Sequence, residues 1–348
     1  MPSTTTVQKP LQTFGREAGD FDALPIIDLA TLRSPDIQER RELARKIDKA
    51  CTDVCFFYVK SHGVSEELIS ATYKAAHRFF SLEEGQKMKY YLGNSTNFRG
   101  YSPLYGEKSS NPDLEGDAEK IFPGALSEAF DMGYEIPADL QKSPGHVLPD
   151  DVYGLLGKNQ WPSDDAVPGL RDAYTRYFGE VLELARALMR VFALALDLEE
   201  DFFDPMMEYP GVTSRMLHYP PQPVEGEEVP GLAAHTDDIP ALQVRNKHGE
   251  WITAPPIPAT FIVNISDSLA LWFKSTIHRV VNLTGEERYS IPFFFGVDYN
   301  TTISVLENQV SEKKPPCCRP FKVGEYVRKK LASAYIGYGG QPAGRKQA

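Results

Sequence analysis

The chain has 348 residues, which suffices for one main core with added helices but not for three average domains. Its 37 Lys and Arg residues against 48 Asp and Glu residues give a net charge of −11, which repels a phosphate backbone and argues against nucleic acid as a partner. No run of about twenty uncharged apolar residues and no secretory signal pattern is present, so we expect a cytoplasmic protein without a membrane partner.

The four cysteines do not form a pattern typical of disulfides or of zinc. Cys51 and Cys55 could be half of a metal site, but the sequence has no second Cys or His pair that would complete it. Cys317 and Cys318 are adjacent in sequence and carry no recognisable chemistry. We therefore expect reduced, structural thiols.

The N-terminal part predicts a flexible arm and then alternating strands and helices. Residues 1–20 are rich in Ser, Thr, Gln and Pro and lack the apolar content of a packed segment. Strands are predicted over 24–29 and 54–59, a helix over 39–51, and a second helix that begins after the cap residue Ser65. No glycine-rich phosphate loop joins these elements, which excludes a dinucleotide-binding start.

Residues 93–165 are dense in Gly, Pro, Asn and Ser and predict a long irregular stretch that lines or covers a site. The strongest helix is predicted over 169–196, with Arg186 and Arg190 on the side opposite its apolar stripe. The stripe comprises Leu170, Tyr174, Phe178, Val181, Ala185, Leu188, Phe192 and Ala195.

After Pro210 the pattern changes to short β-rich segments separated by turns. The predicted strands are 215–219, 242–245, 251–252, 261–265, 275–281 and 289–296, and a last helix is predicted over 325–335. Turn chemistry at 247–250 favours antiparallel pairing. We expect an α+β fold with a double-stranded β-helix (jelly-roll) core and a flanking helical layer. The expected divisions are an arm (1–20), a helical and strand region (21–207), the jelly-roll core (208–310) and a C-terminal helix and tail (311–348).

The informative motif is His235-Thr-Asp237, followed by His278. Side chains two residues apart on an extended segment point to one face, so His235 and Asp237 can share a metal. His278 from another strand would complete two imidazoles and one carboxylate, an arrangement typical of iron(II) oxygenases that leaves positions open for co-substrate and O₂. Alone, a His-x-Asp sequence such as 235–237 is common by chance. A lone His in an apolar segment, such as His278, is more often a core residue.

Arg288 and Ser290 are also two residues apart and predict a site for a carboxylate. The guanidinium of Arg288 matches a carboxylate with a planar fork of donors, and the hydroxyl groups of Ser290 and Tyr219 could add donors. A 2-oxo diacid such as 2-oxoglutarate would chelate iron at one end and be held here at the other. The alternative, that these are solvated strand residues, is weakened because all the residues occur in order on predicted strands.

Five segments resemble landmarks of the isopenicillin N synthase-like branch of the iron(II)/2-oxoglutarate-dependent dioxygenases. They are 24–29 (LPIIDL), 55–63 (CFFYVKSHG), 97–101 (NFRGY), 217–220 (LHYP) and 288–296 (RYSIPFFFG). The resemblance covers nearly the whole chain. It implies His235, Asp237 and His278 as iron ligands, Arg288 and Ser290 as the 2-oxoglutarate clamp, and Tyr219 as a helper.

The chain departs from that family at two places. A turn and a Thr- and Leu-rich strand usually follow the His-x-Asp motif, whereas here Asp237 is followed almost at once by 239–244 (IPALQV). Trp272 joins Phe273 without the usual polar turn, so Asp237 and His278 are only 41 residues apart. A core strand is therefore expected to be absent. We hypothesise that the chain is a splice variant or comes from an imperfect gene model. Transcript sequencing that finds no longer form would contradict this hypothesis.

The function that follows is oxidation, most simply hydroxylation, of a C–H bond in a small organic molecule of secondary metabolism, with Fe²⁺, 2-oxoglutarate and O₂. Two alternatives remain open. One is an iron oxidase that does not use 2-oxoglutarate, and the other is an inactive splice variant or pseudoenzyme that lacks the core strand. We expect a monomer.

Overall fold

The structure is a computed structural model, and it describes part of the chain. The described residues are 19–107, 125–143, 145–221, 241–265, 276–280, 285–306 and 319–335. All but the last two residues of the predicted arm lie outside this part, as do His235, Asp237, Cys317, Cys318 and both expected deletions. Those expectations therefore stay predictions. Cys51 and Cys55 are buried and form no disulfide.

The largest sheet is antiparallel and is built around one ten-residue strand, β5. Its strands are β3 (Gly100–Ser102), β4 (Glu128–Gly133), β5 (Pro210–Tyr219), β10 (Arg288–Ser290) and β11 (Phe293–Asp298). Their order is β10-β5-β4-β3, and β11 also pairs with β5. Both β10 and β11 can pair with β5 because β10 lies beside the C-terminal end of β5 and β11 beside its N-terminal end. The predicted antiparallel pairing is confirmed.

The described part of the chain also contains three smaller sheets. Their strands are β1 (Ile26–Asp28), β2 (Phe56–Lys60), β6 (Leu242–Arg245), β7 (Trp251–Ala254), β8 (Thr260–Asn264), β9 (His278–Val280), β12 (Thr302–Ile303) and β13 (Phe321–Lys322). The orders are β1-β2-β8, β7-β6-β9 and β12-β13. The predicted hairpin turn joins β6 to β7, where Asn246 Oδ1 accepts hydrogen bonds from the backbone N–H groups of His248 and Glu250.

The described helices are α1 (Ile37–Asp53), α2 (Glu66–Phe80), α3 (Glu84–Lys87), α4 (Leu170–Ala195) and α5 (Val323–Ala334), with short 3₁₀ turns at Met88–Tyr90, Leu92–Asn94, Ile136–Ala138 and Asp204–Met206. Helices α2 and α4 lie as a helical layer on one side of the large sheet, with α1 packed on α4, whereas the end of α5 contacts the other face, where the Tyr335 hydroxyl donates to Asp131. As predicted, Ser65 caps α2, and its Oγ accepts a hydrogen bond from the Leu68 N–H. In the described residues, no helix is both long and apolar enough to cross a membrane.

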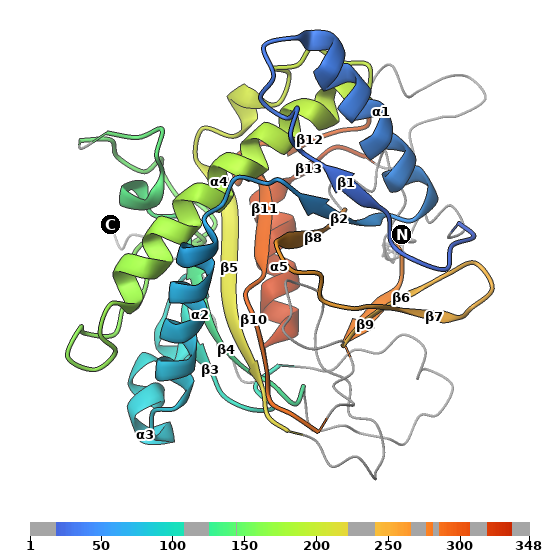
Figure 1. Ribbon diagram of the computed structural model, residues 1–348. Coiled ribbons are helices and arrows are strands. Elements are labelled where there is room, and N and C mark those ends of the chain that lie inside the picture. The colour runs from blue at the N-terminus through green and yellow to red at the C-terminus, as the bar shows by residue number, and fades with distance from the viewer. Residues whose placement is uncertain are drawn as a thin grey trace, which may run out of the picture.

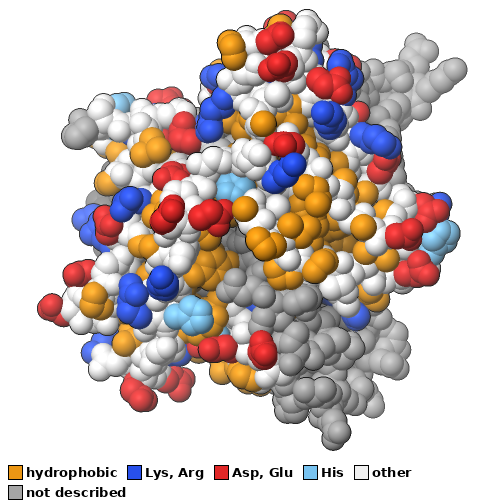
Figure 2. All heavy atoms as spheres, viewed as in Figure 1, with side chains coloured by type: hydrophobic (Ala, Val, Ile, Leu, Met, Phe, Trp, Pro, Cys, Tyr) orange, Lys and Arg blue, Asp and Glu red, His pale blue; other side chains and the backbone are white. Residues whose placement is uncertain are grey.

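Figure 1 shows α2 and α4 on one side of the sheet formed by β5, β10 and β11, with β6, β7 and β9 on the other side. The apolar stripe of α4 faces this sheet, where the rings of Phe178 and Phe293 are 5.0 Å apart. From α2, Phe79 reaches the ring of Phe130 on β4 at 4.5 Å. On the face seen in Figure 2, acidic and basic side chains are interspersed over the helical layer. The core therefore lies between the helices and β4, β5 and β11.

The prediction that 93–165 is irregular was wrong at two places, because β3 and β4 lie in this stretch, β4 inside the large sheet and β3 at its edge. All six residues of β4 are buried, including Glu128 and Asp131. The strand shows no alternation of apolar and polar residues because its polar side chains are buried in ion pairs, with Lys87 and Arg215.

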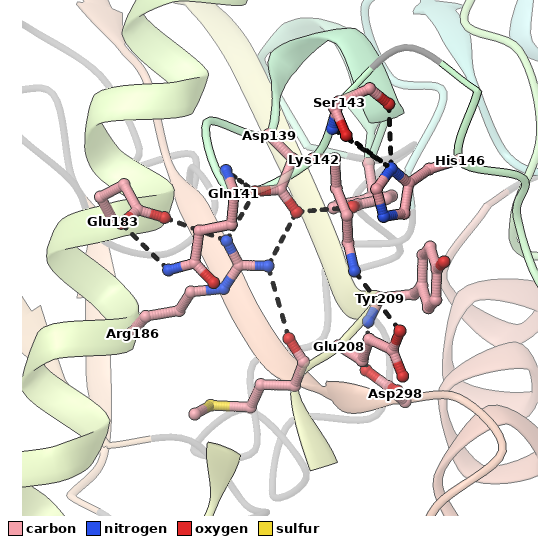
Figure 3. A network of polar contacts seen from close by, with 12 residues as sticks. Asp139, Gln141, Lys142, Ser143, His146, Glu183, Arg186, Glu208, Tyr209 and Asp298 are labelled. Atoms are coloured by element: carbon pink, nitrogen blue, oxygen red, sulfur yellow. Dashed lines mark hydrogen bonds and ion pairs between the residues drawn. The ribbon is translucent and has the colours of Figure 1, made fainter. Parts of the chain in front are cut away.

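The burial of Arg186 was not anticipated from its predicted place opposite the apolar stripe of α4. Its side chain is 8% exposed and forms a bidentate ion pair with Asp139, at 2.6 and 2.8 Å (Figure 3). Arg190, one turn later, is 53% exposed and pairs with Asp204. A long-range carboxylate therefore draws Arg186 into the interior, which helical periodicity alone cannot reveal.

We expect Phe79→Ala to lower the free energy of unfolding by about 3–5 kcal/mol. Phe79 is 0% exposed and contacts the rings of Phe80, Tyr101 and Phe130, so truncation leaves a cavity between α2 and the sheet. Urea unfolding followed by circular dichroism measures the change. Ile26→Ala, at a position that is 53% exposed, is the control and should change stability by less than about 1 kcal/mol. Equal losses for both variants would contradict the assigned core.

We expect Asp298→Asn to stabilise the protein at pH 7.5 but not at pH 4. Burial raises the pKa of Asp298 to about 6, although the Tyr209 N–H donates a 2.9 Å hydrogen bond to its carboxylate (Figure 3). Because the folded-state pKa exceeds the unfolded value of about 3.9, the stability contributed by the protonated acid is full below about pH 4 and is lost as the pH rises through 6. Asn stays neutral throughout.

Urea unfolding at both pH values measures this effect, with Asp165→Asn at an exposed position as control. If Asp298→Asn raised the free energy of unfolding equally at pH 4 and pH 7.5, the stabilisation would not come from the protonation of Asp298.

Candidate active site

The predicted carboxylate clamp lies on β10, where Arg288 and Ser290 share one face. Arg288 pairs with Tyr219 and Ser290 with Leu217 across β5. The intervening Tyr289 points to the other face, where its ring lies 3.6 Å from that of His77 on α2. Because side chains alternate along a strand, Arg288 and Ser290 project away from the helical layer. Both are only 1% exposed.

Tyr219 lies against Arg288 rather than beside Ser290. Its ring centroid is 4.5 Å from the guanidinium carbon, and the ring is 1% exposed. The sequence prediction gave Tyr219 a hydroxyl-donor role, whereas this geometry favours a cation–π contact that holds the guanidinium against the ring. The structure therefore brings Arg288, Ser290 and Tyr219 together at one place.

Ser290 supports the interpretation of this place as a carboxylate site. Its Oγ is buried and has no hydrogen-bond partner among the described residues. A buried hydroxyl without a partner is costly, and a carboxylate oxygen would accept its hydrogen bond. Since the guanidinium beside it supplies positive charge, the residues present fit the distal carboxylate of a 2-oxo diacid.

His278 lies on β9, in a different sheet from the clamp. Its Nδ1 is 3.1 Å from the carbonyl oxygen of Thr276, and its ring packs at 4.9 Å on that of Phe56. An Nδ1–H donated to a backbone carbonyl orients the ring and makes Nε2 the nitrogen that a metal would use, as in histidines that bind metals. The orientation of His278 thus fits a ligand of iron(II).

The complete set of iron ligands is not brought together in the described part of the chain, since His235 and Asp237 lie outside it. Within that part, no group of three His, Cys, Asp or Glu side chains is placed to hold a metal ion. The three-ligand assignment therefore stays a prediction, supported at His278 alone.

Behind the clamp lies a polar group that the sequence analysis missed. The carboxylate of Glu128 on β4 accepts hydrogen bonds from Lys87, Tyr101 and His218. Burial alone would raise the pKa of Glu128, but these three donors hold it below its ordinary value. Alternation over 215–219 does predict that His218 and Tyr219 face opposite ways. Nothing in the sequence indicates the partners of His218.

We expect Ser290→Ala to leave the free energy of unfolding unchanged, or to raise it by up to about 1 kcal/mol, in the absence of any 2-oxo acid. The substitution removes a buried hydroxyl that makes no hydrogen bond to the described residues. The matched control is Ser214→Ala on β5, where the buried Oγ donates to the Pro292 carbonyl at 2.9 Å. The free energy of unfolding of that variant, measured in urea, should be lower by about 1 kcal/mol. A comparable loss for Ser290→Ala would mean that its hydroxyl already has a partner.

Two family models match the chain. The N-terminal domain model of the non-haem dioxygenases in morphine synthesis matches residues 24–164, and the 2OG-Fe(II) oxygenase superfamily model matches residues 213–297. Together the two matches cover more than half of the chain, including β9, β10 and most of β5 and β11.

Similar proteins of comparable length occur in fungi and plants. The chain is 31% identical to the 2-oxoglutarate-Fe(II) type oxidoreductase ppzC of Metarhizium rileyi, over 96% of this chain and 92% of that protein. It is 34% identical to the homoarginine-6-hydroxylase 2-ODD-C23 of Glycine max, over 92% of this chain and 99% of that protein.

The fold is similar to that of a full-length Neurospora crassa protein crystallised with alpha-KG and thymine. The TM-score is 0.72 at 25% identity, with 89% of this chain and 96% of that chain covered. The jelly-roll expectation is thereby confirmed. By these matches the chain belongs to the iron(II)- and 2-oxoglutarate-dependent oxygenases, an enzyme family that uses Fe(II), 2-oxoglutarate and O₂.

Proposed function

We propose that this chain hydroxylates a C–H bond of a small organic molecule, and that Arg288 and Ser290 bind the distal carboxylate of 2-oxoglutarate. The observation that carries the proposal is the buried face of β10, where the Ser290 hydroxyl lies without a partner among the described residues, beside the guanidinium of Arg288. Tyr219 packs against that guanidinium. His235, Asp237 and His278 are the proposed iron ligands.

Bound iron supplies the activation of O₂, coupled to conversion of 2-oxoglutarate to succinate and CO₂, so that one oxygen atom enters succinate and the other the substrate C–H bond. The residues of the chain have simpler tasks. Arg288 and Ser290 orient the 2-oxo acid through its far end, and the buried face of β10 excludes water from that contact. The carbonyl of Thr276 holds the imidazole of His278 in the metal-binding tautomer.

The names of similar proteins support a small organic substrate rather than one particular compound. They include a homoarginine-6-hydroxylase, an azadirone synthase of Melia azedarach and JOX2, which was crystallised with 2OG, Fe and JA. Hydroxylation in secondary metabolism is consistent with this range. The net charge of −11 argues against a nucleic-acid partner, and we further propose a cytoplasmic monomer.

The test has two parts, a binding titration and a screen. Addition of 2-oxoglutarate to the iron(II)-loaded protein without oxygen should produce the visible charge-transfer band of the chelated 2-oxo acid. Arg288→Lys keeps the charge but loses the planar fork, so its Kd for 2-oxoglutarate should rise at least about tenfold. The matched control is Arg245→Lys, since Arg245 also lies over an aromatic ring, that of Trp251 on β7, but away from the clamp. That variant should bind 2-oxoglutarate as the wild type does.

Small molecules are then screened for succinate release, with His278→Ala as the blank. A folded wild-type protein that gives neither the charge-transfer band nor succinate would contradict the proposal and favour the inactive form. Substrate oxidation without succinate release would instead favour the iron oxidase that does not use 2-oxoglutarate.

A further inference from the structure

The strand that carries the clamp is short and is held to β5 by only three residue pairs. Three pairs fix the register of a strand weakly unless the side chains of its two faces are anchored. On the clamp face, Arg288 and Ser290 must accept a ligand. The anchoring of β10 therefore depends on its opposite face, where Tyr289 is the only side chain.

Tyr289 is buried, and His218 covers its ring from the adjacent strand. The two residues are direct partners across β5 and β10, with ring centroids 4.7 Å apart and an interplanar angle of 22°. On the α2 side, His77 and Phe80 contact the same tyrosine ring at 3.6 and 6.1 Å. Tyr289 is thus enclosed by aromatic rings, and the imidazole of His218 is the one that belongs to the sheet.

The imidazole of His218 is itself fixed by carboxylates at both nitrogens. Its Nδ1 lies 2.8 Å from Glu128, which is 5% exposed, and its Nε2 lies 3.2 Å from Glu287, which is 52% exposed. The bond to Glu128 is the stronger constraint because it is buried, whereas a solvent-exposed carboxylate contributes little. Through Glu287, His218 also contacts the residue immediately before Arg288.

Glu128 is in turn rigid. Lys87 donates to it at 2.6 Å, and Tyr101 donates to the same carboxylate oxygen. Direct pairing across β4 and β5 also places Glu128 opposite His218. A continuous set of contacts therefore runs from Lys87 through Glu128 and His218 to Tyr289, which lies between the two clamp residues.

We propose that His218 is a positioning residue for 2-oxoglutarate: held by Glu128, its ring fixes Tyr289 and so sets the orientation in which Arg288 and Ser290 meet the distal carboxylate. This inference rests on the proposed function of the clamp. His218 itself faces away from Arg288 and touches no co-substrate. Its effect is therefore confined to ligands that use the clamp.

The decisive variant is His218→Phe, which keeps an aromatic ring against Tyr289 but removes the hydrogen bonds to both carboxylates. Glu128 keeps its bonds from Lys87 and Tyr101, so no buried carboxylate is left unpaired and the variant should fold. His77→Phe is the matched control, because His77 also contacts the ring of Tyr289 but lies on α2 rather than on the sheet.

The probes are 2-oxoglutarate and 2-oxobutyrate, titrated into the iron(II)-loaded proteins without oxygen and followed by the charge-transfer band. 2-Oxobutyrate chelates iron in the same way but has no distal carboxylate. We expect His218→Phe to raise the Kd for 2-oxoglutarate roughly tenfold and to leave that for 2-oxobutyrate within about twofold. His77→Phe should change neither value.

Three results would overturn the inference. His218→Phe could bind 2-oxoglutarate as the wild type does, or it could weaken both 2-oxo acids equally, which indicates a general loss of the metal site. His77→Phe could match the effect of His218→Phe, which indicates aromatic packing alone. Failure of the clamp itself is distinguishable, because only then does Arg288→Lys also bind 2-oxoglutarate as the wild type does.

Discussion

The antiparallel pairing of β10 with β5 decides which side chains reach the buried face of the sheet. Arg288 lies opposite Tyr219, and Ser290 opposite Leu217. Because the side-chain period of a strand is two residues, a slip of one residue would turn Arg288 toward α2 and Tyr289 toward the clamp. The guanidinium would then meet the aromatic surface of His77 and Phe80. The helical layer thus helps to enforce the register on which the proposed carboxylate site depends.

The same argument explains why the helices belong to the functional unit rather than merely covering it. Phe79 and Phe80 are neighbours on α2, and their ring contacts reach β4 and β10, respectively. α4 packs on α2 and meets β11 through Phe178. The position of β10 is therefore fixed by burial of aromatic surface on one side, while its other side remains available for a polar ligand.

The sequence predicted those parts of the fold whose residues follow a simple period. The predicted strand 242–245 coincides with β6, and the predicted helix 169–196 differs from α4 by one residue at each end. Alternation also grouped Arg288 with Ser290. It could not find β4, because Glu128 and Asp131 are buried through partners distant in sequence. The burial of Arg186 was missed for the same reason, and the contacts of His218 depend on three separate segments.

Buried ion pairs on both faces of β4 and β5 indicate what this sheet is built to do. Asp131 meets Arg215 at 2.6 Å on the clamp face, and Glu128 meets Lys87 on the helical face. Removing charges from water costs so much that such pairs add little net stability. They do restrict position, since a small displacement weakens a short polar contact more steeply than it weakens apolar packing. A sheet that holds the proposed clamp gains from that restriction, because misplacement of the clamp relative to iron ligands on another sheet would lower the rate more than a modest loss of stability would.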